Sequence, residues 1–245
     1  MARVTVISGG GTGIGRAVAA AFAAEGDDVV IVGRRADVLD RAAKEIGDRV
    51  VPIAADIAEV DGAQRVAAAV RERFGRVDVL VNNAGGAMGA ADGRGRAAAA
   101  AEAWTANFRA NVLTAVLLTE ALTDLLAEGG RVVLLSSIAA FRGSGTGAYG
   151  GSKAALHPYA IDLANALGPR GITVNVVAPG YTTDTEFFGD GMTAERHDRL
   201  VGQTATGRAG TVDDVAATIA WLASPAAGQV TAQIIQVNGG AVPGR

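Results

Sequence analysis

The chain has 245 residues, of which 49% are hydrophobic and 19% are charged, and its formal net charge is -3. This composition is typical of a globular protein with enough apolar side chain to fill one extended core. The mild acidity argues against a nucleic-acid surface, which needs a concentrated basic patch. The absence of cysteine excludes disulfides, thiolate metal sites and cysteine nucleophiles, and the presence of only two histidines argues against a histidine-rich metal site.

The chain shows no targeting or membrane signal. No uncharged apolar run approaches the ~18 residues that a membrane span needs. The first residues already form a strand pattern, from Arg3 to Ser8, instead of a basic leader followed by an apolar segment. We therefore expect a soluble, cytoplasmic protein that binds neither membranes nor nucleic acids.

Short β-branched runs alternate with longer alanine-rich segments that have helical character. Nearly every gap between the runs is long enough for a crossover helix, which predicts a parallel sheet covered by helices on both faces. The order favours an α/β doubly wound dinucleotide-binding fold of about seven strands, in one domain over residues 1–245. The expected strands are Val4–Ser8, Val29–Val32, Val50–Ala54, Val77–Val81, Arg131–Ser136, Ile172–Val177 and Ile234–Val237.

The turn after the first strand is rich in glycine and opens a helix. Glycines let backbone amides approach a pyrophosphate, and the helix N-terminus stabilises its negative charge. The alternative is a tight strand-to-helix turn without a ligand. Position at the first βα junction favours nucleotide binding, with the candidate residues Ser8, Gly9, Gly11, Thr12, Gly13, Ile14 and Gly15.

Two arginines follow the second strand. An NAD site normally has an acidic residue here for the ribose 2′-hydroxyl, whereas this chain has Gly33, Arg34 and Arg35. A guanidinium pairs with phosphate through its planar fork, so the position favours the 2′-phosphate of NADP. Arg34 is the better candidate because it lies closer to the strand end. The alternative is a pair of solvated arginines at a helix start.

Polar and small residues follow the third and fourth strands. A carboxylate at Asp56 suits an adenine amino group and Ile57 the ring, although Asp56 equally suits the N-cap of a helix over Ala58–Phe74. Asn83, Ala84 and Gly85 either hold the backbone close to the nicotinamide ribose or hydrogen-bond a turn.

Tyr149 and Lys153 stand four residues apart at the start of a helical pattern that continues from Ala154 to Leu167. Residues at this spacing share a helix face, so a phenol and an ammonium can converge on one ligand. A phenol titrates near 10, and a nearby ammonium lowers that pKa toward the range useful for proton transfer. Alone, the spacing is a common chance match. Lys153 is one of only two lysines in an arginine-rich chain.

Together these segments resemble the short-chain dehydrogenase/reductase family, in its single-domain subgroup of this length. The resemblance covers essentially the whole chain and rests on motifs that occur jointly, in order and at the family's spacing. They are Ser8-Gly9-x-x-x-Gly13-Ile14-Gly15, Asp56, Asn82-Asn83-Ala84-Gly85, Asn111, Ser136-Ser137, Tyr149-x-x-x-Lys153 and Pro179-Gly180.

The resemblance implies roles for the matching residues. Tyr149 is the expected acid in carbonyl reduction and the base in alcohol oxidation. Lys153 is expected to bind the nicotinamide ribose and to lower the Tyr149 pKa. Asn111, in an expected helix over Asn107–Leu126, is expected to hold a water that links Lys153 to solvent. A serine is expected to stabilise charge on the substrate oxygen.

Two positions depart from the family pattern. Counting back 13 residues from the tyrosine selects Ser136 as the serine, whereas the local strand-end pattern selects Ser137. Because loops absorb deletions and sheets fix register, we favour Ser137. The segment after Pro179-Gly180 is one residue longer than usual, so Thr185 is the expected carboxamide ligand, with Thr183 as the alternative.

The sequence therefore predicts an NADPH-dependent ketoreductase or alcohol dehydrogenase, with 3-oxoacyl-(acyl-carrier-protein) reductase among the candidate activities. An enoyl reductase is disfavoured because it usually spaces tyrosine and lysine more widely. A non-catalytic NADP-binding redox sensor is disfavoured because the tetrad is complete. Four arginines are candidates to meet an acidic carrier but are better explained as solvated surface residues; they are Arg94, Arg96, Arg109 and Arg142.

Segments outside the strands set the remaining expectations. Tyr181–Gly210 is the expected substrate lid, before a helix that starts near Thr211. The run Ala97–Ala101 favours a helix through Trp104. Apolar residues on more than one side of the helices Asn107–Leu126 and Ala148–Leu167 fit pairing across a two-fold axis. The resemblance implies a homotetramer, or otherwise a homodimer, and His157 is expected at a surface or interface.

Overall fold

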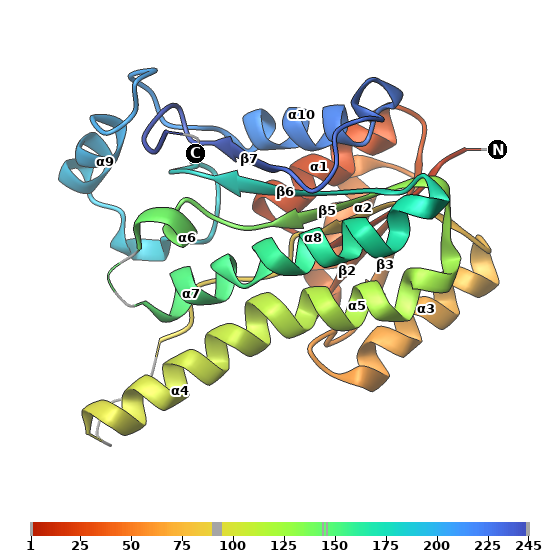
Figure 1. Ribbon diagram of the computed structural model, residues 1–245, viewed down its shortest axis with the longest axis horizontal. Helices are drawn as coiled ribbons and strands as arrows, with labels where there is room; N and C mark the ends of the chain where they lie inside the picture. Colours follow the sequence, from red (N-terminus) through yellow and green to blue (C-terminus); the bar gives the residue numbers. More distant parts are fainter. Residues whose placement is uncertain (1, 90–94, 144, 146, 244–245) are drawn as a thin grey trace.

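Seven apolar segments form one parallel sheet in the computed structural model, which describes residues 2–89, 95–143, 145 and 147–243, without the Asp190 side chain. The strand order is β3-β2-β1-β4-β5-β6-β7 (Figure 1). Strands β2 and β3 are added on one side of β1, and β4 to β7 are added on its other side, so the order of the strands reverses between β1 and β4. This confirms the predicted doubly wound α/β fold. The strands are β1 (Val4–Ser8), β2 (Asp28–Gly33), β3 (Val50–Ala54), β4 (Val77–Asn82), β5 (Leu126–Leu135), β6 (Thr173–Pro179) and β7 (Ile234–Val237).

Three strands have the predicted bounds, and β5 differs most from its prediction. It begins at Leu126 instead of Arg131, because Leu126 pairs with Val77 across a register shift in β4. It also ends at Leu135, which leaves Ser136 and Ser137 beyond the last strand residue. Both serines therefore lie at the carboxyl edge of the sheet, where ligands bind in this class of fold.

Helices cover both faces of the sheet. Alternate residues of each strand point to opposite faces, so Val6 packs with α3, α5 and α8, whereas Ile7 packs with α1, α2 and α10. The helices are α1 (Gly13–Ala24), α2 (Ala36–Ile46), α3 (Val60–Arg73), α4 (Arg96–Phe108), α5 (Thr114–Leu122), α6 (Ala139–Arg142), α7 (Ala148–Ala154), α8 (Leu156–Leu167), α9 (Ala194–Val201) and α10 (Val212–Leu222). Among the described residues, no helix is both long and apolar enough to span a membrane.

The helix predicted over Asn107–Leu126 begins earlier and ends earlier in the structure than predicted. It begins as α4 at Arg96, passes through a π-helical turn at Arg109–Leu113 and ends as α5 at Leu122. The alanine run expected to start a helix is part of α4. The helix that carries Tyr149 is interrupted between α7 and α8. Pro158 lacks the N–H that would bond the carbonyl of Ala154, the last residue of α7.

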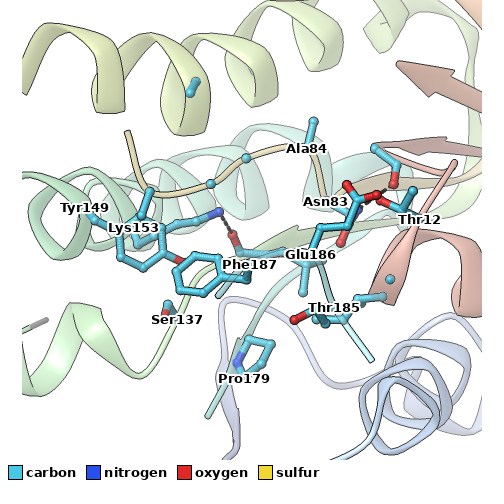
Figure 2. Close-up of a pocket in the computed structure, with 18 of the residues that line it drawn as sticks. Thr12, Asn83, Ala84, Ser137, Tyr149, Lys153, Pro179, Thr185, Glu186 and Phe187 are labelled. Atoms are coloured by element: carbon cyan, nitrogen blue, oxygen red, sulfur yellow. Dashed lines mark hydrogen bonds between the residues drawn. The ribbon is translucent and has the colours of Figure 1, made fainter. Parts of the chain in front are cut away.

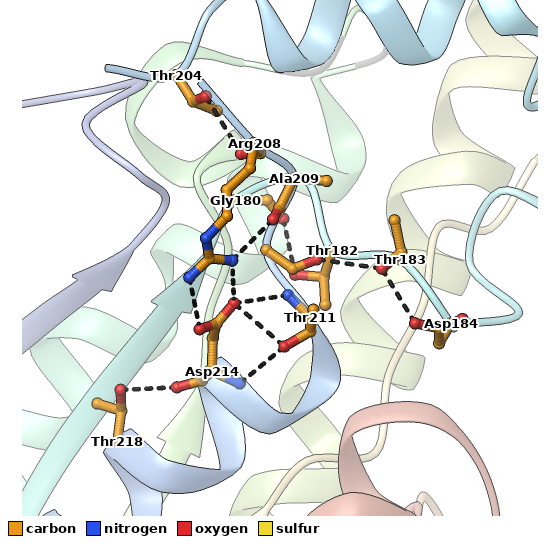
Figure 3. Close-up of polar contacts among 11 residues, drawn as sticks. Gly180, Thr182, Thr183, Asp184, Thr204, Arg208, Ala209, Thr211, Asp214 and Thr218 are labelled. Carbon is orange, nitrogen blue, oxygen red and sulfur yellow. Dashed lines mark hydrogen bonds and ion pairs between the residues drawn. The ribbon is translucent and has the colours of Figure 1, made fainter. Parts of the chain in front are cut away.

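The segment expected as a lid runs from the end of β6 to the start of α10. Backbone hydrogen bonds join its two ends. The Thr183 amide donates to the Gly210 carbonyl at 2.9 Å, and the Gly210 amide donates to the Tyr181 carbonyl at 3.0 Å. Between these ends lie a short 3₁₀ turn, Gly189–Gly191, and α9. The lid is therefore a loop closed at its base (Figure 3).

An ion pair and a capping box fix the end of the lid to α10. Arg208 donates two hydrogen bonds to Asp214, at 2.6 and 2.8 Å. Asp214 also accepts from the Thr211 amide at 2.8 Å, and the Thr211 hydroxyl caps the Asp214 amide. These contacts hold the pKa of Asp214 well below its usual range, the Arg208 hydrogen bond having the largest effect.

We predict that Asp214→Ala lowers the free energy of unfolding by about 1–2 kcal/mol at pH 7, because a helix cap and an ion pair are lost. A carboxylate whose folded pKa is depressed stabilises the protein above its unfolded pKa, near 4, and loses that effect as the pH falls. Urea denaturation of both proteins from pH 7 to pH 3 should therefore show the difference shrinking below pH 4. Asp213→Ala, exposed in the same helical turn, is the control; an equal, pH-independent loss in both variants would contradict the prediction.

Candidate active site

A cleft of 1020 Å³ crosses the carboxyl ends of β1 to β6. The β1–α1 turn and the ends of β2 and β3 line one half, which we call the cofactor half. The end of β5, α6, α7 and α9 line the other, which we call the substrate half. Figure 2 shows Thr12 and Asn83 at one side of the view and Tyr149 and Ser137 at the other. Of the predicted residues, those that line the cleft are Gly9, Gly11, Thr12, Gly13, Ile14, Arg34, Arg35, Asp56, Ile57, Asn83, Ala84, Gly85, Ser137, Tyr149, Lys153, Pro179, Gly180 and Thr185.

The glycine turn leaves the N-terminus of α1 open to a ligand. Gly9 and Gly13 have φ angles of 67° and 51°, which favour glycine. The N-cap residue Thr12 makes no side-chain cap bond, and the first turn of α1 has no acidic residue. Free backbone amides and an unneutralised helix dipole fit the pyrophosphate of a dinucleotide.

Two residues predicted to bind the cofactor lie behind the cleft instead. The Ser8 hydroxyl is buried and accepts hydrogen bonds from the Asn83 and Ala84 amides, each at 3.0 Å. A Cβ atom on Gly15 would lie 2.1 Å from the Gly9 carbonyl oxygen, so only glycine fits there. Ser8 and Gly15 shape the turn and the end of β4, and they do not line the cleft.

Arg34 and Arg35 both line the cofactor half at the end of β2. Arg35 pairs with Glu186 of the lid at 2.9 Å, and both side chains are exposed. Arg34 is exposed too and forms no ion pair within the described part of the chain. An unpaired guanidinium at this edge fits a phosphate group.

Both carboxylate oxygens of Asp56 accept hydrogen bonds from other residues of the protein. One carboxylate oxygen accepts from the Ala58 amide at 3.1 Å, and the other accepts from Arg109 at 3.0 Å. The N-cap of α3 is Glu59, so the alternative expectation of a cap at Asp56 is wrong. Ile57 is buried and lines the cleft next to it.

Gly85 brings three predicted residues together. A Cβ atom there would lie 2.4 Å from Asn111 Oδ1 and 2.9 Å from Lys153 Nζ, so only glycine lets the β4 end pass between them. Asn111 does not line the cleft. It lies in the π-helical turn, where its amide donates to the Gly86 carbonyl at 2.9 Å and its oxygen accepts from the Gly86 amide at 2.9 Å. Asn111 therefore fixes the backbone over Lys153.

The Lys153 ammonium is buried without a carboxylate partner in the described chain. It donates to the Leu135 carbonyl at 2.7 Å, and burial lowers the pKa of Lys153 to about 8. Burial raises the pKa of Tyr149, and a hydrogen bond with Ser137 acts in the opposite direction. The expected lowering of the Tyr149 pKa by Lys153 is absent from this structure, because the ammonium bonds the end of β5 and desolvation dominates. Tyr149 is therefore a protonated phenol at neutral pH.

The two serines after β5 have different partners. The Ser136 hydroxyl donates to the Lys153 carbonyl at 3.0 Å, and its oxygen lies 2.8 Å from His157 Nε2. Ser137 is half-buried, contacts Tyr149 and points into the cleft (Figure 2). This geometry favours Ser137 over Ser136, and it gives His157 a contact beneath the site.

The geometry also separates the two threonines that follow β6. Thr185 lines the cleft with Pro179 and Gly180, whereas Thr183 bonds Asp184 and the Gly210 carbonyl at the base of the lid. Thr185 approaches the position that a Cβ atom on Gly13 would take, at 3.5 Å. It is therefore the threonine that faces the glycine turn.

Sequence reasoning missed two neighbouring lid residues, Glu186 and Phe187. Glu186 pairs with Arg35, and the Phe187 ring centroid lies 5.2 Å from that of Tyr149 (Figure 2). No sequence signal singles them out within the long lid segment. It also missed Ser152, whose hydroxyl accepts from the Asn111 amide at 3.1 Å. Within the described chain, no group of three or more histidine, aspartate or glutamate side chains is placed to hold a metal ion.

Comparison with known proteins gives the family. Residues 9–242 match a family model described as enoyl-(acyl carrier protein) reductase. The chain is 37% identical to an uncharacterised oxidoreductase of Methylorubrum extorquens, over 97% of both chains. It is 32% identical to a 3-oxoacyl-(acyl-carrier-protein) reductase of Synechocystis, over 98% of this chain and 97% of that one. The chain belongs to the short-chain dehydrogenase/reductase family, and is an oxidoreductase of the kind that acts on carbonyl and alcohol groups.

Solved structures agree with this assignment. A short-chain dehydrogenase/reductase from Brucella melitensis shares 34% identity, with a TM-score of 0.91 over 99% of this chain and 97% of that one. A short-chain dehydrogenase from Burkholderia cenocepacia, solved in complex with NADP, shares 34% identity, with a TM-score of 0.84 over 98% and 97% of the two chains. Structural relatives therefore bind NADP on this fold.

The geometry of the serines generates a prediction. Ser137→Ala should lower kcat by about 10²–10³-fold, because it removes the hydroxyl beside Tyr149 that would face developing charge. Ser136→Ala should lower the melting temperature while retaining most of kcat, because it removes bonds to the Lys153 carbonyl and His157. Steady-state kinetics and thermal denaturation of both variants provide the check. The opposite pattern would make Ser136 the active serine.

Proposed function

We propose that this protein is an NADPH-dependent ketoreductase that reduces a carbonyl to a secondary alcohol and also catalyses the reverse oxidation. The observation that carries the proposal is Tyr149, protonated and buried beside Ser137, in the same cleft as the open N-terminus of α1. When bound, the nicotinamide cofactor supplies or accepts a hydride.

The protein's own residues would hold the substrate and move the proton. Tyr149 would donate its phenolic proton to the carbonyl oxygen, and Ser137 would donate a hydrogen bond to the same oxygen as charge develops there. Lys153 would bind the ribose. With its pKa at about 8, it would also restore the tyrosine proton near neutral pH. Asn111 would keep Gly85 and Gly86 at the ribose and support a water-linked path to Lys153.

The preference for NADPH over NADH rests on the cofactor half of the cleft. No acidic side chain follows β2, where Gly33, Arg34 and Arg35 stand instead. Arg34 would bind the 2′-phosphate, and Arg35 would assist once it leaves Glu186. Ile57 would flank the adenine ring, and Thr185 would bind the nicotinamide carboxamide. The NADP complex of the Burkholderia relative supports this assignment.

The proposed substrates are defined by their class, carbonyl compounds and secondary alcohols. A 3-oxoacyl-(acyl-carrier-protein) is one candidate, supported by the Synechocystis relative of that name. Of the arginines expected to meet such a carrier, Arg109 pairs with Asp56 and Glu59, and Arg94 lies outside the described residues. Enoyl reduction, which the family model's description names, is less well supported because Tyr149 and Lys153 have the shorter spacing.

Assembly as a homotetramer, or otherwise a homodimer, belongs to the same proposal. Large apolar side chains are exposed on the helices expected to pair, with Trp104 and Phe108 on α4 and Ile161 on α8. An assembly that pairs these helices across a two-fold axis would cover such residues.

Replacing Tyr149 tests the chemistry. Tyr149→Phe should lower NADPH-dependent ketone reduction by at least about 10²-fold, because the proton donor is lost. NADPH binding, followed by the change in cofactor fluorescence, should remain within a few-fold of the unmodified protein. Persistent turnover would rule out this mechanism. Cofactor binding by the unmodified protein with no turnover of any ketone would favour the redox-sensor alternative.

Replacing Arg34 tests the cofactor. Arg34→Ala should raise the KM for NADPH by about 10–100-fold, because a charge-assisted contact to the 2′-phosphate is lost. The KM for NADH should stay unchanged. Arg41→Ala is the control, since Arg41 lies on α2 and its ion-pair partner among the described residues is the exposed Asp37. An unmodified protein that uses both cofactors equally would overturn the role of Arg34.

A further inference from the structure

Three arginines line the substrate half of the cleft. Arg142 comes from α6, and Arg196 and Arg199 come from α9 in the lid. Figure 1 places α6 and α9 at the same end of the molecule, beyond the carboxyl ends of β5 and β6. The two helices therefore bring positive charge to one side of the cavity that contains Tyr149.

A hydrogen bond joins the elements that carry these arginines. Arg142 donates to the side-chain oxygen of Gln203, just after α9, at 2.7 Å. Arg196 and Arg199 are three residues apart and share a face of α9. Arg196 donates to the Gly191 carbonyl at 2.9 Å, and its guanidinium lies 5.0 Å from the centre of the Phe188 ring. The cluster is thus partly held in place before any ligand arrives.

None of the three arginines pairs with a carboxylate within the described residues. By contrast, Arg35 and Arg109, which line the same cleft, are each paired with an acidic side chain. The described carboxylates that line the cleft, Asp56 and Glu186, are the ones that pair with them. Unpaired positive charge in the substrate half is not explained by the cofactor, whose phosphates fit the glycine turn and Arg34.

Apolar side chains line the same cavity as the arginines and the reacting groups. Ile138, Phe187 and Leu200 line the cleft together with the arginine cluster, and Phe187 packs on the Tyr149 ring. A ligand that reaches from Tyr149 to the guanidinium groups would therefore also have apolar side chains to contact in this cavity. These groups form paired hydrogen bonds best with planar or tetrahedral oxyanions.

We propose that Arg142, Arg196 and Arg199 form a subsite for an oxyanion on the substrate, so that the preferred substrates are small keto acids or keto phosphates, or the matching hydroxy compounds. This inference rests on the proposed ketoreductase function and adds the charge of the substrate to it. Arg199 is the principal ligand, because it is exposed and has no side-chain partner among the described residues. Arg142 and Arg196 add positive charge from positions fixed by Gln203 and Gly191.

The test compares charged and neutral substrates of the same length. Methyl ketones bearing a terminal carboxylate, with one to six intervening methylenes, are assayed beside their methyl esters with saturating NADPH. A parallel series with a terminal phosphonate and its dimethyl ester distinguishes phosphate from carboxylate recognition. We expect kcat/KM to favour the anionic member by about tenfold or more at the best length. The preference should fall as salt is added.

Matched variants assign the preference to the cluster. Arg199→Gln should bring the ratio of kcat/KM for each anion to that for its ester close to one, and Arg199→Glu should reverse the preference. Arg142→Gln should weaken it. Arg65→Gln is the control, because Arg65 is exposed on α3, away from the cleft lining. It should keep the preference intact.

The outcomes separate the inference from the function on which it rests. Equal kcat/KM for anions and esters in the unmodified protein would overturn the subsite while leaving the ketoreductase function in place. An anion preference that persists in Arg199→Glu and Arg142→Gln would also overturn it. Failure to reduce any ketone, charged or neutral, would instead count against the proposed function.

Discussion

The hydrogen bond from the Lys153 ammonium to the Leu135 carbonyl joins the two elements on which the candidate site depends. It connects α7 to the last residue of β5 at 2.7 Å, in a place that excludes nearly all solvent. The bond thereby helps to fix the relative positions of Tyr149 and Ser137. Tyr149 is held one turn back on α7, and Ser137 follows two residues after Leu135. A buried ammonium is costly without a carboxylate partner, and Lys153 has none in the described chain, so the Leu135 carbonyl compensates for part of that cost.

The same region explains why so many small residues are needed. Gly85 passes within van der Waals reach of Lys153 and Asn111, and Gly15 packs against the backbone of Gly9. The Ser8 hydroxyl accepts hydrogen bonds from the two backbone amides that follow β4. Glycine and serine at these positions are consequences of close packing around the cleft as much as of ligand contact. The sequence analysis assigned Ser8 and Gly15 to the ligand because their motif cannot distinguish the two roles.

The predictable part of the structure is the part that local chemistry determines. Short β-branched runs between alanine-rich segments located all seven strands, and motifs at strand ends found the cleft, because parallel strands end at the same edge. Strand register favoured Ser137 over Ser136, and the structure places the Ser137 side chain beside Tyr149. The π-helical turn at Asn111 was not foreseen, because it depends on bonds to Gly86, distant in sequence. The Tyr149 pKa was misjudged because desolvation depends on the whole fold. Glu186 and Phe187 were missed because lid contacts follow no short-range pattern.

The adjacency of Glu186 and Phe187 has a mechanical consequence. One residue touches Arg35 in the cofactor half, and the next packs on Tyr149 in the substrate half. Both are held by a single stretch of backbone within a loop whose ends are tied together at Thr183 and Gly210. A displacement of that stretch would separate Glu186 from Arg35 and Phe187 from Tyr149 in the same movement. The contacts that the lid makes with the two halves of the cleft are thus mechanically coupled, because adjacent residues of one backbone segment make them.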